Sequence, residues 1–406
     1  MAPTRRTRIL IVDDSAVMRS LLRSVVCSDA GLEVAGTAAD GASALTALEL
    51  NRPDLILLDV EMPVMDGLVT LRELRRRGNR MPVIMCSSLT QRGATVTIEA
   101  LAGGASDYVT KPAGQSSREA ALLTLGKELI PKIRALTNPS LSPSPAQYPG
   151  LSPLRPKPVS FGVARAPLIQ PPPVPATLPL TLPTIQPPKP QSISSIPTVV
   201  AIGVSTGGPA ALDVLLPALP ANFPLPVLIV QHMPELFTRL FAERLNSRCN
   251  LHAREASEND PVRAGTIYIA RGNWHLETLA ASLPGAPPTL CLNQGPLENH
   301  CRPAVDVLFR SVARVYGSGV LAVVLTGMGS DGLLGCRMVR EQGGSVLAQD
   351  EASSTVWGMP GAVAGAGLAH KVLPLDAIAA EILRIVGRTR GETRQTPRDL
   401  SRQAVS

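Results

Sequence analysis

One serine lies in a pattern that is typical of a nucleophile. Gly203, Ser205 and Gly207 alternate where an apolar run meets a segment in which Pro209 suits the first turn of a helix. The glycines allow a sharp turn without Cβ clashes, and the serine hydroxyl is then exposed at a helix N-terminus. Free N–H groups around Thr206 and Gly207 can hold an oxyanion there, which is worth roughly 2.7–4 kcal/mol per donor. A phosphate-binding turn and a plain strand-to-helix loop remain alternative interpretations.

A serine nucleophile needs a base, and all five histidines of the chain lie after residue 231. His232 directly ends an apolar run, one strand–helix–strand step after Ser205, and adjacent parallel strands would bring both residues to one edge of a sheet. His275 and His300 lie in loop-like segments, so they are alternatives with substrate-contacting or structural roles. Two further histidines are expected to be surface or packing residues: His252 and His370.

The carboxylate that orients the base is predicted to be Asp331, in a glycine-rich loop after another buried strand. Asp331 would hold the tautomer of His232 while His232 takes the proton of Ser205. The competing carboxylates are Asp306, which is expected to be a helix cap or surface residue, and Asp260, in a polar turn. The chain order Ser, His, Asp differs from that of α/β-hydrolases and disfavours that family.

A second group of reactive residues occupies strand ends in the first third of the chain. Asp13 and Asp14, Asp59, Ser87 and Lys111 each follow a separate apolar run, and such ends meet at one edge of a doubly wound sheet. Crowded carboxylates repel one another, and an all-oxygen site that relieves this repulsion suits Mg²⁺. Asp59 could attack a phosphoryl group while Lys111 neutralises its oxygens and Ser87 donates a hydrogen bond. Any one of these residues alone could be a solvated or capping side chain.

Two α/β domains are needed to position these residues. Residues 1–137 alternate five strand-like runs with helical patterns, which predicts a doubly wound parallel sheet. Residues 198–387 resume the alternation and predict a second, larger domain of the same class. Residues 138–197 hold 18 of the 39 prolines and predict a flexible, proline-rich linker. A basic tail at 388–406 is expected to be disordered.

Composition excludes several classes of protein. With 45% hydrophobic and 17% charged residues, the 406-residue chain is globular rather than disordered. The linker has four basic and no acidic residues, and the tail has five basic and two acidic, so these two segments account for the whole net charge of +7. The two domains are therefore jointly neutral, and eleven aromatic residues leave little for base stacking. We expect no nucleic-acid partner.

The apolar runs and the cysteines predict a cytoplasmic protein. No run approaches the ~20 residues of a membrane span, and the N-terminal apolar run is too short for a signal peptide. We therefore expect no membrane insertion. The six cysteines form no CxxC pair, which indicates neither a disulfide framework nor a structural zinc site.

The first domain, including Lys111-Pro112, resembles the receiver domain of two-component response regulators. This resemblance implies that Asp59 is the phosphoacceptor. It also implies a Mg²⁺ site with Asp14 and Asp59 as ligands, Asp13 in or beside the metal shell, and the backbone carbonyl of Glu61 as the third protein ligand.

The same resemblance implies a switch and a partner. Tyr108 would reorient together with Ser87 on phosphorylation. Because the domain has no histidine of its own, a separate chemotaxis histidine kinase would be the phosphodonor.

Four segments of the second domain resemble the catalytic domain of chemotaxis protein-glutamate methylesterases, the CheB family: GVSTGGP, VQHMP, RPAVDVLF and LTGMGSDG. The resemblance implies hydrolysis of γ-glutamyl methyl esters, and deamidation of glutamines, on the cytoplasmic helices of methyl-accepting chemoreceptors. It implies Ser205, His232 and Asp331 as the triad, with the backbone at Thr206 and Met328 as oxyanion donors. Both reactions pass through an acyl-enzyme that releases methanol or ammonia before water attacks. No cofactor is expected for that step.

The shared chain and flexible linker suggest regulation. We expect the unphosphorylated receiver to cover the Ser205 edge and phospho-Asp59 to weaken that packing. A receiver joined to a DNA-binding output is the first alternative, but the second domain is too long for a simple helix-turn-helix module and has no basic recognition helix. A non-catalytic adaptor, or a hydrolase for another ester, stays open.

Overall fold

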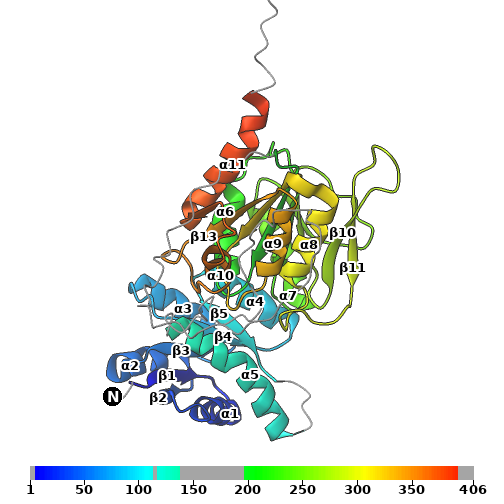
Figure 1. Cartoon of the computed structure of the whole chain (residues 1–406). Helices are drawn as coiled ribbons and strands as arrows, with labels where there is room; N and C mark the ends of the chain where they lie inside the picture. The colour runs from blue at the N-terminus through cyan, green and yellow to red at the C-terminus, as the bar shows by residue number, and fades with distance from the viewer. Residues whose placement is uncertain (1–4, 113–116, 138–195, 392–406) are drawn as a thin grey trace, which may run out of the picture.

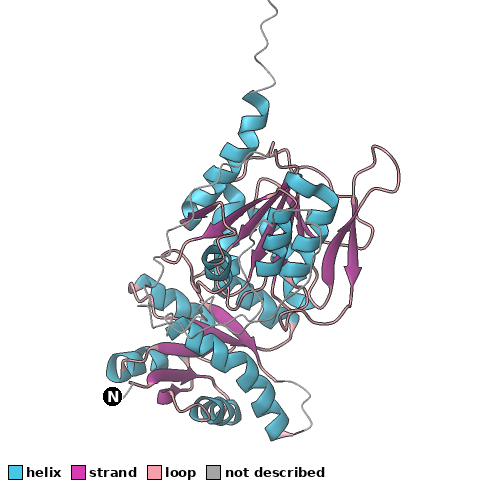
Figure 2. Ribbon diagram, viewed as in Figure 1, coloured by secondary structure: helices cyan, strands magenta, loops and turns pink. Residues whose placement is uncertain are grey.

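The computed structural model describes residues 5–112, 117–137 and 196–391. Almost all of the predicted linker, 138–197, lies outside the described residues, and so does the predicted tail beyond Gly391. Figure 1 shows the two α/β units one above the other, and Figure 2 shows a sheet with flanking helices in each.

The N-terminal unit, residues 5–137, is here called the receiver unit after the domain that its sequence resembles. It is built on a five-stranded parallel sheet of order β2-β1-β3-β4-β5. Its strands are β1 (Thr7–Val12), β2 (Leu32–Ala38), β3 (Leu55–Asp59), β4 (Val83–Ser87) and β5 (Asp107–Thr110). Its helices are α1 (Ala16–Cys27), α2 (Gly41–Asn51), α3 (Gly67–Arg76), α4 (Gln91–Ala102) and α5 (Arg118–Thr137).

Alternation along β1 shows how this sheet is covered on both faces. Ile9 and Ile11 pack with α1 and α5, whereas Leu10 and Val12 pack with α2, α3 and α4. Because helices cover both faces, the inner strands are almost wholly apolar. Polar residues are therefore confined to the strand ends, as the sequence predicts.

The second unit, residues 196–391, is here called the catalytic unit after the domain that its sequence resembles. It has a seven-stranded parallel sheet of order β14-β13-β12-β6-β7-β9-β8. Its strands are β6 (Val199–Val204), β7 (Val227–Gln231), β8 (His252–Glu255), β9 (Thr266–Ile269), β12 (Val320–Val324), β13 (Ser345–Gln349) and β14 (Lys371–Leu373). Its helices are α6 (Gly208–Leu215), η3 (Leu216–Ala218), α7 (Glu235–Arg248), α8 (Val305–Tyr316), η4 (Gly317–Gly319), α9 (Leu333–Glu341), α10 (Met359–Gly365) and α11 (Leu375–Gly391). A separate antiparallel hairpin joins β10 (His275–Leu279) to β11 (Thr289–Asn293).

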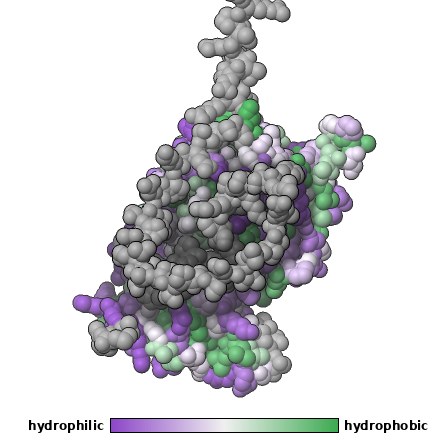
Figure 3. Space-filling view, viewed as in Figure 1, coloured by the Kyte–Doolittle hydropathy of each residue, from purple (hydrophilic) through white to green (hydrophobic). Residues whose placement is uncertain are grey.

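The two doubly wound α/β sheets confirm the predicted fold class, with additions at the margins. The edge strands β8 and β14 and the hairpin were not predicted, because their residues are short runs with mixed polarity. The hairpin projects from the unit (Figure 1 and Figure 3). Exposed Leu283 lies in the segment that connects its two strands. Helix α11 continues to Gly391, four residues past the predicted domain end at 387. Among the described residues, no helix is long and apolar enough to cross a membrane.

The two units pack directly against each other. Helix α4 of the receiver contacts α6 and α7 of the catalytic unit, and Figure 1 shows α4 between the two sheets. The ring of Tyr108, at the receiver edge, stacks on Phe237 of α7 with centroids 4.7 Å apart. Buried apolar residues of both units form one continuous cluster across this contact.

Candidate active site

The three residues predicted as a triad meet at one edge of the catalytic sheet. Ser205 follows β6, His232 follows β7, and Asp331 follows β12, and these strands are neighbours with β6 in the middle. His232 Nδ1 lies 3.1 Å from Ser205 Oγ, and His232 Nε2 lies 2.8 Å from Asp331 Oδ2. A base can therefore take the serine proton while a carboxylate holds the other ring nitrogen.

Glycine makes the serine turn possible. Gly207 has φ +77°, and a Cβ at this position would lie 2.3 Å from Thr355 Oγ1. The turn is also held by backbone contacts, since the Ser205 amide donates to the Thr326 carbonyl at 3.0 Å. Thr326 Oγ1 in turn donates to the Thr206 carbonyl at 2.9 Å. The serine hydroxyl thus stands on a rigid turn.

Asp331 lies in a dense set of donors. It is 2% exposed, and it accepts from the amides of Val305, Asp306 and Gly332 at 2.7, 3.0 and 2.9 Å. Burial raises the pKa of Asp331, but the hydrogen bond from His232 and the backbone donors outweigh it, so the net pKa is lowered. Asp331 therefore stays ionised beside the histidine.

The pKa of His232 moves the other way. Burial lowers the pKa of its imidazole, but the hydrogen bond that it donates to Asp331 and the contact with Cys301 raise it by more, so the net direction is upward. The thiol Sγ of Cys301 lies 3.6 Å from His232 Nδ1, the same nitrogen that faces Ser205. A raised pKa favours proton uptake from the serine.

The serine turn and the loop after β12 each present a free amide donor. Within the described part of the chain, the N–H groups of Thr206 and Met328 have no hydrogen-bond acceptor. Both residues line one cavity together with Ser205. These are the two predicted oxyanion donors, and their free N–H groups suit that role.

The competing histidines lie away from the nucleophile or serve the structure. His275 is in strand β10 rather than in a loop, is 2% exposed, and bonds the Pro296 carbonyl and the Ala304 amide. His300 is exposed and lines the cavity. The remaining two contact residues remote from the triad, with His252 bonded to Asn246 and His370 bonded to Arg340.

The competing carboxylates also have clear places. The sequence suggested that Asp306 is a helix cap or a surface residue, and the second of these is wrong. Asp306 is 1% exposed, and it accepts from the Gly335 amide at 2.6 Å. Burial and the charge of Asp331 raise the pKa of Asp306 to about 6. Asp260 forms an ion pair with Arg254 and lies outside the cavity.

The receiver site gathers the predicted carboxylates. Ligand oxygens of Asp13, Asp14 and Asp59 all lie within 4.8 Å of one another. Lys111 Nζ lies 2.8 Å from Asp13 Oδ2 and 2.7 Å from Asp59 Oδ1. Burial raises the pKa of Asp59 to about 6, although Lys111 opposes the shift. This set of hard oxygen donors fits Mg²⁺.

The other predicted receiver residues lie around this group. The Glu61 amide donates to Asp59 Oδ1 at 3.4 Å, which places Glu61 in the loop beside Asp59. Ser87 is fully buried at the end of β4, next to β3. Tyr108 is 6% exposed and faces the catalytic unit rather than solvent.

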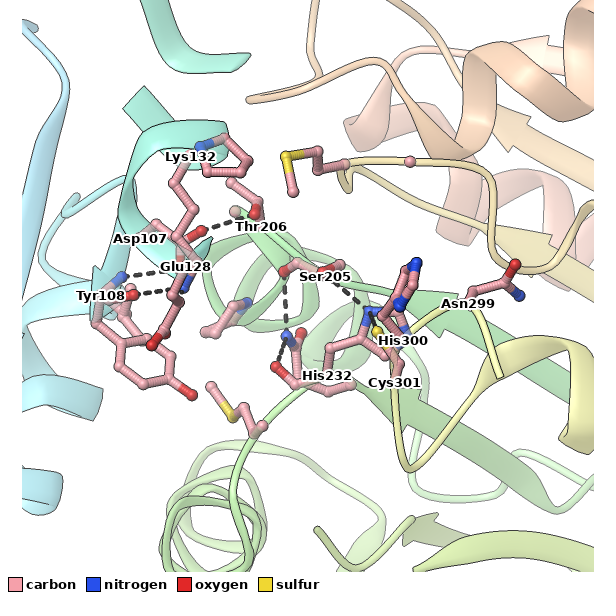
Figure 4. A pocket seen from close by; sticks show the side chains of 18 of the residues that line it. Asp107, Tyr108, Glu128, Lys132, Ser205, Thr206, His232, Asn299, His300 and Cys301 are labelled. Carbon is pink, nitrogen blue, oxygen red and sulfur yellow. Dashed lines mark hydrogen bonds and ion pairs between the residues drawn. The ribbon is translucent and has the colours of Figure 1, made fainter. Parts of the chain in front are cut away.

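A cavity of about 680 Å³ lies between the two units and opens on Ser205. Figure 4 shows receiver residues on one side of it and the loop that carries Asn299 and Cys301 on the other. Across it, Thr206 Oγ1 donates to Asp107 Oδ2 of the receiver at 2.6 Å. Sequence patterns do not predict this contact. They also do not predict the ion pair between Lys132 and Asp107, in which Lys132 Nζ lies 3.4 Å from Asp107 Oδ1.

Comparison with known proteins matches both units. A family described as CheB methylesterase matches residues 200–382, and one described as response regulator receiver domain matches residues 9–122. The solved structure of the Thermotoga maritima CheB methylesterase catalytic domain is 41% identical, covers 47% of this chain and all of that chain, and has a TM-score of 0.46.

Two relatives match along nearly the whole chain, and both are named protein-glutamate methylesterase/protein-glutamine glutaminase. The protein from Trichodesmium erythraeum is 46% identical over 387 residues, covering 94% of this chain and 99% of the relative. The protein from a Nocardioides species is 47% identical over 386 residues, covering 94% and 96%. The chain therefore belongs to the CheB family of receiver-linked protein-glutamate methylesterases/protein-glutamine glutaminases and is an enzyme of that class.

Proposed function

We propose that this enzyme is a serine hydrolase that removes γ-glutamyl methyl esters from chemoreceptors, and deamidates their glutamines, under control of receiver phosphorylation. The observation that carries the proposal is the hydrogen-bonded line of Ser205, His232 and Asp331, which opens into a cavity. A phosphate-binding turn would need neither the base nor the carboxylate. Because the substrate lies on cytoplasmic receptor helices, the reaction belongs in the cytoplasm and gives chemotactic adaptation.

The chemistry follows from the positions of the atoms. His232 Nδ1 takes the proton of Ser205 as Oγ bonds to the ester carbonyl carbon, and the carbonyl oxygen becomes an oxyanion. The amides of Thr206 and Met328 donate to that oxyanion. The carbon–oxygen bond to the methoxy group then breaks, and His232 returns the proton so that methanol leaves.

Water completes the cycle by the same route. His232 takes a proton from water, the hydroxide oxygen bonds to the acyl carbon, and Ser205 Oγ leaves with the proton from His232. The product is a glutamate carboxyl group. With glutamine the first leaving group is ammonia instead of methanol.

The receiver supplies the proposed control. Residues of α5 and β5 form one wall of the cavity, so substrate helices meet the receiver before they meet Ser205. Asp59 is the proposed phosphoacceptor, with a chemotaxis histidine kinase as phosphodonor. Asp13, Asp14 and Asp59 would hold Mg²⁺, with the Glu61 carbonyl as a further ligand, and the ion would neutralise phosphoryl oxygens. Lys111 is placed to bind a phosphoryl oxygen, and Ser87 and Tyr108 would shift in response.

The decisive experiment is methanol release from methylated chemoreceptor by the intact chain, with acetyl phosphate and Mg²⁺ present. We expect Ser205→Ala to lose activity by at least ~10³-fold. Ser247→Ala, which removes an exposed serine hydroxyl on α7, should keep the wild-type rate. Equal methanol release by wild type and Ser205→Ala would show that Ser205 is not the nucleophile.

Regulation is tested with the same assay. Wild type should be faster with acetyl phosphate and Mg²⁺ than without them, because phospho-Asp59 adds about −1.5 to −2 charge next to a packed interface. Equal rates in the two conditions would exclude control by the receiver.

A further inference from the structure

We propose that Asn299 is a positioning residue for the triad, an inference that rests on the proposed roles of His232 and Asp331. Asn299 Nδ2 donates to Asp331 Oδ1 at 2.8 Å and to Asp306 Oδ2 at 3.0 Å. One amide group thus bridges two buried carboxylates. A donor between like charges offsets the repulsion that would otherwise turn them apart.

The geometry gives Asn299 a distinct part in holding Asp331. The backbone donors to Asp331 come from the start of α8 and from Gly332: the Val305 amide bonds Oδ2, and the Asp306 and Gly332 amides bond Oδ1. Among the described residues, His232 and Asn299 are the two side chains that donate to it, one to each oxygen. Asn299 therefore adds a side-chain donor on the carboxylate oxygen that His232 does not contact, and it helps the backbone amides to hold the carboxylate plane against the imidazole.

The loop around Asn299 is shaped for this contact. The Glu298 and Cys301 backbones bond each other at 3.1 and 2.9 Å, which closes a tight turn. Asn299 has φ +52°, a left-handed conformation that asparagine tolerates better than most residues. Glu298 also pairs with Arg310 of α8, which ties the loop to the helix that carries Asp306.

Several titratable and charged groups lie near this amide, although Asn299 itself is partly open to solvent. His232 contacts Asp331 from the end of β7, Asp306 of α8 accepts from Asn299, and Arg310 of α8 pairs with Glu298. Glu298 lies on its own loop, and the buried thiol of Cys336 lies on α9. The amide is neutral, so it separates the two carboxylates without adding charge near the base.

The position of the loop links this contact to the substrate. Asn299 and Cys301 both line the cavity beside Ser205, and Figure 4 shows them on the side opposite the receiver residues. The side chain therefore lies on the wall of the cavity that opens on Ser205 and yet bonds to the carboxylate behind the base. The expected effect of its loss is on the rate of the chemical step rather than on substrate binding.

The test is steady-state methanol release from methylated chemoreceptor by the intact chain, activated with acetyl phosphate and Mg²⁺. Asn259→Ala is the matched control, because Asn259 also has positive φ (+61°) and lies outside the cavity. We expect Asn299→Ala to lower kcat at least tenfold with KM within twofold, and Asn259→Ala to leave both unchanged.

A second variant tests the electrostatic effect of residue 299 on the Asp331–His232 pair and keeps the shape of the asparagine side chain. Asn299→Asp adds a negative charge near Asp331, which favours the protonated imidazole of His232. The acidic limb of the kcat/KM profile should then move upward by roughly one pH unit. Asn259→Asp should leave the limb in place.

Three results would overturn the inference. These are a kcat of Asn299→Ala within twofold of wild type, a change in KM alone, and an unmoved acidic limb in Asn299→Asp. Circular dichroism of each variant shows whether the chain is folded. If Ser205→Ala is inactive and Asn299→Ala is fully active, only this inference fails, whereas an active Ser205→Ala would refute the proposed triad itself.

Discussion

The hydrogen bond between Thr206 and Asp107 offers a direct test of the proposed control of the esterase by the receiver. Thr206 Oγ1 donates to Asp107 Oδ2 at 2.6 Å, and the contact joins the serine turn to the first residue of β5. The substitution Asp107→Asn keeps the size of the side chain and an oxygen that can still accept from the Tyr108 amide. It removes the charge that strengthens the bond to Thr206.

The expected magnitude follows from the type of bond. Hydrogen bonds to charged groups contribute about 1.5–3 kcal/mol, whereas neutral ones contribute about 0.5–1.5 kcal/mol. The substitution should therefore weaken the closed arrangement by about 1–1.5 kcal/mol. Since 1.36 kcal/mol is a factor of ten in an equilibrium constant, the open fraction of the unphosphorylated chain should rise about tenfold.

The assay is methanol release from methylated chemoreceptor without acetyl phosphate. Asp107→Asn should be about tenfold faster than wild type, and its further activation by acetyl phosphate should shrink by the same factor. The matched control is Asp54→Asn, because Asp54 also accepts a backbone amide and pairs with an arginine but lies before β3. If Asp107→Asn and Asp54→Asn both keep the wild-type rate, the Thr206 contact does not hold the closed arrangement.

Two further predictions concern the two reactive centres. Asp331→Asn should lower kcat by about 10⁴-fold, because the carboxylate that raises the pKa of His232 and fixes its tautomer is lost; methanol release by the phosphorylated chain measures this, and a loss below tenfold would contradict the triad. Activation by acetyl phosphate should fade as pH falls below about 6, because burial raises the pKa of Asp59 to about 6 and its protonated form is neither a nucleophile nor a good ligand for Mg²⁺. The ratio of activated to basal rate from pH 5 to 8 tests this, and EDTA should abolish the activation at every pH.

Much of both sites could be predicted from sequence because parallel sheets place strand ends side by side. Ser205, His232 and Asp331 were each assigned to the end of an apolar run, and the structure places those ends on three neighbouring strands. The same rule predicts that Asp59 and Lys111 lie close together in the receiver, and the structure places them in contact. The apolar run and the polar residue at its end are local features, so they can be recognised in the sequence without knowledge of the tertiary structure.

The residues that sequence patterns missed depend on contacts between distant elements. Asn299 and Asp331 are 32 positions apart in the sequence. Their side chains meet because Asn299 lies in a turn with left-handed backbone that directs its amide toward Asp331. Asp306 reads as an ordinary residue in the first turn of a helix, and only the packing of α8 against α9 shows that it is buried. Polarity and spacing along the chain carry no information about such partners.

The contacts between the two units are not encoded in local sequence patterns. Sequence alone suggested that the receiver covers the Ser205 edge, but it named neither Asp107 nor Phe237 as contacts. Phe237 sits on α7 with helical spacing that is equally suited to the core of its own unit, where it is fully buried. A helix pattern predicts an apolar face and does not identify the element that packs on it.

Strand β5 gives the interface a short physical connection to the phosphoacceptor. Lys111, which contacts Asp59, comes directly after β5, and its amide bonds the Ser87 carbonyl at 2.7 Å. Tyr108 and Asp107, which contact the catalytic unit, lie three and four residues earlier on the same strand, roughly 10–13 Å away. A phosphoryl group on Asp59 would compete with the carboxylates for Lys111 at one end of this strand. We expect strand β5 to shift in response and to strain the Thr206 contact at its other end. Asp107→Asn weakens that contact without touching Asp59, and it therefore separates the release of the interface from the phosphorylation that is proposed to cause it.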